Sequence, residues 1–399
     1  MNILSNEYVS NVPNHARIAP GGPANFAREL SGFVTEHGHT WTGIIHQGTT
    51  EGSKTVIRQV ATVGKKSYAY CEYPFAHVDA FLQSTKKIDP RVWFTPQIEC
   101  IREYIRRVQP DLLFLNGFSV YAWILLEAAN QEGLPIAIQH AGISQVEFEQ
   151  YKDLFSHVGR MGMLQMERDV VDAATRQVFL NDYSRRAFCA RVARVPKAKA
   201  AIIPLPYQKT YTATRPAHRA KTQDPNRIVV GCVARWDRIK NHEAILRLAK
   251  EIKSQGLAWN MKCVTKIPVT AKKQRFKKAY ANAIDVIPHM APDELRNFYD
   301  SVDLMVLPSH FDVSPTVVME AALQGKGTLI SPTVGWVSEY KEAGMADWVI
   351  DFTDPKRVIS RIRKLCSKPL PTRFQKRIKA THAPKKVFAA YLRLFASVT

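Results

Sequence analysis

The stretch of sequence that decides the fold covers residues 303–340 and reads DLMVLPSHFDVSPTVVMEAALQGKGTLISPTVGWVSEY. It opens with the short apolar run 304–307, which ends at Pro308. A short apolar run that ends at a turn is typical of a buried parallel strand. A loop that carries Asp312 comes next, and from Val317 onward apolar residues recur at helical spacing. The stretch therefore predicts a strand, a loop and a helix, the repeating unit of an α/β protein with a parallel sheet.

The start of this helix is predicted from two residues with strong positional preferences. Ser314 is a favoured N-cap residue, and Pro315 is favoured at the first helical position. A helix N-terminus can bind a phosphate, because its free N–H groups and the helix dipole both favour negative charge. Glu320 follows Asp312 by eight residues. The two carboxylates, one in the loop and one a turn into the helix, can therefore flank a single ligand.

This stretch resembles the acidic E-x7-E signature of the retaining glycosyltransferases of family 4, also called group 1. The first acidic residue here is Asp312 rather than Glu, one methylene shorter, which leaves the preferred sugar open. The alternative is an ordinary strand, loop and helix with Asp312 solvated and Glu320 on a polar helix face. The residues that carry the resemblance are Pro308, Ser309, Asp312, Ser314, Pro315, Thr316, Glu320, Ala321, Gly325, Gly335 and Glu339.

A second motif follows the apolar run 227–234, which is predicted to be another buried strand. Arg235 comes directly after it and Lys240 five residues later. Two cations at the end of a buried strand are costly unless an anion meets them. In the resembling family an Arg and a Lys at this spacing clamp the donor diphosphate, the Arg by two-point hydrogen bonding and the Lys as a point charge. The alternative is a helix start with two solvated bases.

The first half of the chain carries two weaker signals. Gly21 and Gly22 precede a predicted helix that ends near Gly38, and paired glycines allow a backbone to approach a ligand closely. His140 ends the predicted strand 135–139, and open α/β sheets bind their ligands at such ends. The resemblance implies that the glycines approach the donor phosphates or the acceptor and that His140 contacts the donor sugar. A turn and a structural histidine are the alternatives.

The resemblance implies the GT-B fold, two Rossmann-like doubly wound parallel-sheet domains that face a central cleft. We expect an acceptor-side domain over residues 1–207, a polar linker at 208–226, and a nucleotide-sugar-binding domain over 208–382. We expect the final helix, within 383–399, to fold back on the first domain. Strands and helices alternate along residues 40–180, which independently favours a parallel doubly wound sheet.

The resemblance further implies a retaining hexosyltransferase-type enzyme that moves a sugar from a nucleoside diphosphate sugar to an acceptor in bacterial glycan or lipid-linked saccharide synthesis. We expect a UDP-sugar rather than a GDP-sugar as donor, and no metal, because the cations neutralise the diphosphate. A nucleotide-sugar epimerase and a non-catalytic nucleotide-sugar-binding partner subunit are the alternatives. The expected catalytic residues are His140 and Asp312; the diphosphate-binding residues are Gly21, Gly22, Arg235, Lys240, Thr316 and Val317; the sugar- and ribose-binding residues are Asp312, Val313, Ser314 and Glu320; the nucleobase-binding residues are Pro288 and His289.

The net charge of +21 is concentrated in the second half of the chain. Residues 1–205 contain 22 basic and 19 acidic residues, a net charge of +3, whereas residues 206–399 contain 34 and 16, a net charge of +18. No acidic residue follows Asp354, but thirteen Lys and Arg residues do. Such a basic stretch can bind an anionic membrane surface, which suits a carbohydrate or lipid-linked acceptor. A solvated tail is the alternative, and without any nucleic-acid-binding motif we expect no nucleic acid partner.

The six cysteines are scattered without a C-x-x-C pair, which predicts reduced thiols rather than disulfides or a zinc site. Residues 1–14 lack the basic and apolar regions of a secretory signal. We therefore expect a cytoplasmic protein that associates, if at all, with the inner face of the cell membrane.

Overall fold

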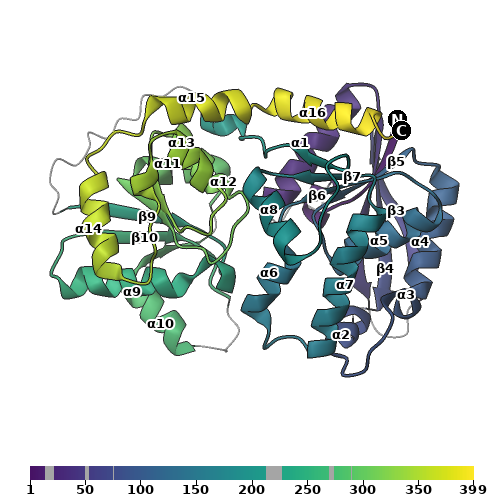
Figure 1. Ribbon diagram of the computed structural model, residues 1–399, viewed down its shortest axis with the longest axis horizontal. Helices are drawn as coiled ribbons and strands as arrows, with labels where there is room; N and C mark the ends of the chain where they lie inside the picture. The colour runs from purple at the N-terminus through teal and green to yellow at the C-terminus, as the bar shows by residue number, and fades with distance from the viewer. Residues whose placement is uncertain (14–21, 50–53, 75, 213–226, 269–273, 289) are drawn as a thin grey trace. The chain divides into compact units, whose positions relative to one another are not determined.

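The computed structural model of the 399-residue chain describes all residues except 14–21, 50–53, 75, 213–226, 269–273 and 289 (Figure 1). The chain divides into two compact units. Unit 1 comprises Met1–Pro206 and Lys385–Thr399, and unit 2 comprises Tyr207–Pro384. The predicted domain limits lie within two residues of these bounds. Most of the predicted linker falls outside the described residues.

In the described part of unit 1, one sheet has eight strands in the order β3-β4-β2-β1-β5-β6-β7-β8. Neighbouring strands are parallel except β3 and β4, which are antiparallel. Only Gly64 and Lys65 join that pair, and Gly64 has φ 58°, so the chain reverses in a tight turn that permits only antiparallel pairing. The strands are β1 (Asn2–Asn6), β2 (Thr40–Thr49), β3 (Val56–Val63), β4 (Lys66–Pro74), β5 (Leu112–Asn116), β6 (Ile136–His140), β7 (Arg176–Phe179) and β8 (Ala200–Ile202).

Helices cover both faces of this sheet, because alternate residues of a buried strand point to opposite sides. Leu113 and Leu115 of β5 pack in a cluster with α2, α4, α5 and α7, whereas Leu112 and Phe114 pack with α1 and α16. The helices of unit 1 are α1 (Gly22–Glu36), α2 (Ala76–Gln83), α3 (Pro90–Trp93), α4 (Thr95–Val108), α5 (Val120–Gln131), α6 (Ser144–Phe148), α7 (His157–Ala173), α8 (Asp182–Arg191) and the C-terminal α16 (Pro384–Ala396), which begins at the last residue of unit 2.

The C-terminal helix α16 is part of the core of unit 1. Its Phe388 and Tyr391 rings lie 6.0 and 5.3 Å from the ring of Phe26 in α1. Both side chains are buried. The last helix therefore returns to the first unit through aromatic packing.

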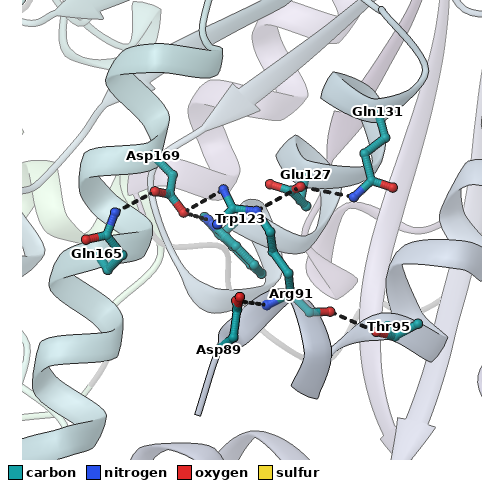
Figure 2. A network of polar contacts seen from close by, with 8 residues as sticks. All are labelled: Asp89, Arg91, Thr95, Trp123, Glu127, Gln131, Gln165 and Asp169. Atoms are coloured by element: carbon teal, nitrogen blue, oxygen red, sulfur yellow. Dashed lines mark hydrogen bonds and ion pairs between the residues drawn. The ribbon is translucent and has the colours of Figure 1, made fainter. Parts of the chain in front are cut away.

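A charged network ties α3, α5 and α7 together (Figure 2). Arg91 Nε lies 3.1 Å from Glu127 Oε1, and Arg91 Nη2 lies 3.2 Å from Asp169 Oδ2. Trp123 Nε1 donates to the same Asp169 oxygen at 3.2 Å. The Glu127 and Asp169 side chains are only 6% and 10% exposed, and a single arginine pairs with both of these nearly buried carboxylates.

In the described part of unit 2, one sheet has five strands, all parallel, in the order β11-β10-β9-β12-β13. The strands are β9 (Val229–Val233), β10 (Asn260–Val264), β11 (Asp285–Ile287), β12 (Leu304–Leu307) and β13 (Thr328–Ile330). The helices are α9 (His242–Ser254), α10 (Gln274–Ala283), α11 (Pro292–Asp300), α12 (Thr316–Leu323), α13 (Val337–Glu342), α14 (Pro355–Leu365) and α15 (Thr372–Thr381). Along the chain, β10 and β11 are added on one side of β9, and β12 and β13 are then added on its other side. The strand order therefore reverses between β9 and β12, and open α/β sheets bind ligands at such a switch point.

Two further expectations can be compared with the structure. All six cysteines are free, as predicted. Among the described residues, no helix has both the length and the apolar character that crossing a membrane requires.

Candidate functional site

The loops that follow β9 and β12 meet at the switch point of unit 2. The backbone N–H of His310 donates to the carbonyl of Ile239 at 2.8 Å, and Asn241 Nδ2 donates to the carbonyl of Pro308 at 3.1 Å. Asn241 is in the left-handed region with φ 54°, which asparagine tolerates better than most residues. The two predicted motifs therefore belong to one local structure.

Lys240 and Asp312 pair with each other at this point. Lys240 Nζ donates to Asp312 Oδ2, and the two side chains are 17% and 12% exposed. The backbone of Asp312 is itself fixed, because Gly335 N donates to its carbonyl at 2.8 Å. A cation and an anion from separate motifs thus satisfy each other while keeping some access to solvent. Such a pair can exchange one partner for an ionic ligand.

The structure does not bring Arg235 into this pair. Its side chain is 80% exposed, and Nη2 lies 3.8 Å from Asp237 Oδ2. Its backbone is fixed more firmly, because the Nε2 of His242 donates to the Arg235 carbonyl at 2.8 Å. The other ring nitrogen of His242 accepts from the Tyr280 hydroxyl at 2.9 Å. The loop after β9 is therefore anchored, whereas the guanidinium projects outward. The sequence contains no pattern that singles out His242.

The start of α12 differs by one residue from the prediction. Pro315 is the N-cap rather than the first helical residue, and no side chain caps the helix. Pro315 has φ −64° and ψ 121°, an extended conformation, so the helix can begin only at Thr316. The predicted capping role of Ser314 was therefore wrong. Ser314 instead lies buried before the cap.

Glu320 points into the interior of unit 2. It is 8% exposed, and its Oε2 accepts a hydrogen bond from the Tyr299 hydroxyl at 2.7 Å. Burial raises the pKa of Glu320, and hydrogen bonds from Tyr299 and Thr316 oppose that rise. The sequence analysis missed Tyr299, because a single tyrosine near the end of an amphipathic helix reads as core.

His140 in unit 1 is enclosed by aromatic rings. It is 1% exposed and stacks on Phe179 at 4.7 Å and 14°, with Phe188 at 4.4 Å. Its Nε2 lies 3.1 Å from Gln177 Oε1, and its Nδ1 has no hydrogen-bond partner among the described residues. Burial lowers the pKa of His140 to about 4, so the ring is neutral near pH 7. With Nε2 donating to Gln177, Nδ1 is left as an acceptor.

A buried carboxylate supports the segment that follows His140. Glu167 is 0% exposed and accepts from the backbone N–H groups of Ser144 at 2.7 Å and Gln145 at 3.0 Å. These N–H groups open α6, so Glu167 satisfies donors that the helix leaves free. Burial is the main cause that raises the pKa of Glu167 to about 7.

The other predicted site residues lie around these groups or outside the described residues. Val313 is buried, and Thr316 and Val317 are half-buried. Pro288 is exposed after β11, and Gly22 is the exposed first residue of α1. Gly21 and His289 lie outside the described residues. Among the described residues, no group of three or more His, Cys, Asp or Glu could hold a metal ion.

Comparison with known proteins gives a family match in the second unit. Residues 214–381 match the family model described as Glycosyl transferases group 1. A curated relative, a putative glycosyltransferase EpsF of Bacillus subtilis (strain 168), is 25% identical over 120 residues. That match spans 30% of this chain and 30% of the length of the relative.

Solved structures match along nearly the whole chain. A sucrose-phosphate synthase from Thermosynechococcus elongatus matches with a TM-score of 0.74 at 13% identity, covering 99% of both chains. An α,α-trehalose-phosphate synthase (UDP-forming) from Burkholderia vietnamiensis matches with a TM-score of 0.69 at 13% identity, covering 100% of this chain and 97% of that one. At such low identity these matches show the fold alone. The second unit therefore matches the family of glycosyl transferases group 1 over residues 214–381, and the two Rossmann-like units have the GT-B fold.

Proposed function

We propose that this protein transfers a sugar from a nucleoside diphosphate sugar to a carbohydrate or lipid-linked acceptor, with retention of anomeric configuration. The observation that carries the proposal is the Lys240–Asp312 pair at the switch point between β9 and β12. This pair lies in the unit that matches the group 1 family. It supplies a cation for a diphosphate and a carboxylate for sugar hydroxyls at one place.

The proposed mechanism begins with an exchange of partners. When the donor diphosphate arrives, Lys240 turns from Asp312 to a phosphate oxygen, and the freed carboxylate accepts a hydrogen bond from a sugar hydroxyl. Arg235 has an exposed guanidinium that can add two-point hydrogen bonds to the diphosphate. The start of α12, at Thr316 and Val317, adds backbone donors. These positive groups stabilise the negative charge that develops on the departing diphosphate.

Three further contacts complete the proposal. His140 accepts from a sugar hydroxyl through Nδ1, the atom that has no partner among the described residues. Glu320 accepts from the ribose hydroxyls, and Val313 and Ser314 line the sugar site. Pro288, with His289, contacts the nucleobase. No divalent metal is needed, because Lys240 and Arg235 supply the positive charge.

We propose a UDP-sugar as the donor. One solved structure of similar fold, with a TM-score of 0.66 and 12% identity, is described as an E. coli trehalose-6-phosphate protein bound with UDP-2-fluoro glucose. A thermal-shift panel of UDP-, GDP-, ADP- and dTDP-sugars with EDTA present tests the choice, because a ligand that binds only the native state raises Tm. We expect the UDP-sugars to raise Tm in the wild type and in Lys250→Ala, an exposed control, but not in Lys240→Ala. A panel without any shift, or an equal shift in Lys240→Ala, would overturn the site.

We also propose that the basic C-terminal stretch binds an anionic membrane surface. Exposed Lys and Arg residues lie along α14 and α15, and each contributes about 1 kcal/mol near an acidic bilayer. Deleting residues 368–399 would remove α16 from the core of unit 1, so charge substitution is the cleaner test. We expect Lys376→Gln with Lys379→Gln to weaken sedimentation with phosphatidylserine vesicles, and wild-type binding to fall steeply with salt. Binding that is indifferent to salt would contradict the proposal.

A further inference from the structure

The Glu320 carboxylate of α12 accepts a hydrogen bond from a residue in another helix, α11. Tyr299, in the last turn of α11, donates its hydroxyl proton to Glu320 Oε2 at 2.7 Å. Tyr299 is 0% exposed and Glu320 is 8% exposed. The hydrogen bond is therefore almost fully removed from water, where a charged acceptor gains most from its donor.

The position of the Tyr299 hydroxyl is set by packing on every side of its ring. The ring meets Tyr211 edge-on at 6.0 Å and 75°. The same apolar cluster contains Met305 of β12 and Ala321 of α12, the residue next to Glu320. Close packing around the buried ring therefore holds its hydroxyl in place beside the carboxylate.

A buried carboxylate needs such a donor for two reasons. Without hydrogen bonds, burial favours the uncharged acid, which accepts poorly from a ligand hydroxyl. A free carboxylate can also rotate about its last bond, and each rotamer presents its oxygens differently. A donor fixed on one oxygen limits both the protonation and the rotation of Glu320.

We propose that Tyr299 is a positioning residue for Glu320: its hydroxyl holds one carboxylate oxygen so that the other is presented to the ribose hydroxyls of the nucleotide. This inference rests on the proposed function, because it assigns a partner to the residue that binds the ribose. Tyr299 itself does not touch the ligand. Its effect must therefore depend on the ribose hydroxyls and must pass through Glu320.

The test compares UDP with 2′-deoxy-UDP by isothermal titration calorimetry. We expect the wild type to prefer UDP by about tenfold or more, the scale of a hydrogen bond to a charged group. In Tyr299→Phe we expect this preference to fall to about twofold. We also expect a higher donor KM with kcat nearly unchanged, because the ribose is bound equally well in the ground state and in the transition state. Tyr340→Phe is the matched control, since it removes another buried hydroxyl of unit 2, which donates to the Thr328 carbonyl at 2.9 Å. The control should keep the wild-type preference.

The outcomes separate the two proposals. A wild type that binds neither nucleotide overturns the proposed function and this inference with it. A wild type that prefers UDP, together with an unchanged preference in Tyr299→Phe, overturns only the role of Tyr299. As a second test, the double variant Tyr299→Phe/Glu320→Gln is compared with Glu320→Gln alone, each at a temperature below its own Tm. Equal preferences are then expected, and a further loss in the double variant would show that Tyr299 acts independently of Glu320.

Discussion

The two units differ in the polar side chains that lie at the carboxyl ends of their strands. In unit 2 a lysine and an aspartate occupy this position and are 17% and 12% exposed. In unit 1 the ends of β5 and β6 hold a buried network of neutral groups. Gln139 Nε2 donates to Asn116 Oδ1 at 3.0 Å, and the Tyr391 hydroxyl of α16 donates to Gln139 Oε1. These three side chains are buried.

The difference separates polar groups that can change partners from those that cannot. A buried amide that leaves its partner loses a hydrogen bond without gaining water, so the network of unit 1 is locked. A partly exposed ion pair can replace one ion by another at low cost. Unit 1 does have charges, but the Arg91 network in its helix layer joins helices to one another (Figure 2). We therefore expect charge to serve ligand binding in unit 2 and stability in unit 1.

The largest expected effect comes from Lys240→Ala. The variant removes the cation proposed for the leaving group and leaves Asp312, 12% exposed, without its ion-pair partner. We expect kcat/KM to fall by about 100- to 1,000-fold, the usual loss when one group that stabilises transition-state charge is removed. Initial rates of donor consumption measure it, with Tm as the check on folding. If Lys240→Ala turned over donor as fast as Lys250→Ala, the proposal that the charge of Lys240 serves catalysis in unit 2 would be wrong.

Glu167→Gln tests whether unit 1 keeps a buried carboxyl uncharged. The pKa of Glu167 rises from its ordinary value of 4.5 to about 7 in the folded protein. Between these pH values the native state holds a proton that the unfolded state has lost, so the unfolding free energy falls as pH rises. The change is at most about 3 kcal/mol. Urea unfolding at pH 5 and pH 8 should show a smaller difference between the two pH values in Glu167→Gln. The exposed Glu36→Gln should keep the wild-type difference, and an unchanged difference in Glu167→Gln would show that Glu167 is ionised throughout.

Arg91→Ala tests the structural role of charge in unit 1. The change leaves Glu127 and Asp169 without their shared cation. We expect a loss of about 2 kcal/mol in unfolding free energy, less than for a fully buried pair because Arg91 is 45% exposed. Urea denaturation measures it. Arg106→Ala is the control, since Arg102 also pairs with its partner Glu132. An Arg91→Ala protein as stable as this control would leave the network without a structural role.

The sequence predicted those features that depend on local patterns. The apolar run 304–307 is β12, and the predicted strand over 227–234 is β9 at Val229–Val233. The GT-B fold is confirmed, and residues 214–381 match the group 1 family model that the motifs resemble. The sequence also predicted that Arg235, Lys240 and Asp312 come after two buried strands. These strands are β9 and β12, which are neighbours at the switch point. Parallel strands end at one edge of a sheet, so motifs distant in sequence meet there.

The remaining features depend on contacts that no local pattern encodes. Tyr299 and His242 act through hydrogen bonds to residues in other elements, and each reads in sequence as an ordinary core or helix residue. The ion pair of Lys240 with Asp312 depends on rotamers rather than on spacing. The capping error at Ser314 arose because proline satisfies both the N-cap and the first helical position, and only its ψ angle distinguishes them. The site residues themselves remain predictions.

The smallest expected effect on activity comes from a change at His140, and it directly tests the difference between the two units. His140→Phe keeps an aromatic ring between Phe179 and Phe188 but removes Nδ1, the one atom of this stack proposed to meet the sugar. We expect kcat/KM to fall about tenfold, the scale of a neutral hydrogen bond. Phe188→Leu, which disturbs the same stack and keeps both ring nitrogens, should retain most of the activity. The reverse result, with His140→Phe active and Phe188→Leu impaired, would make His140 a packing residue. The strand ends of unit 1 would then be structural throughout, and the chemistry of sugar transfer would rest on unit 2.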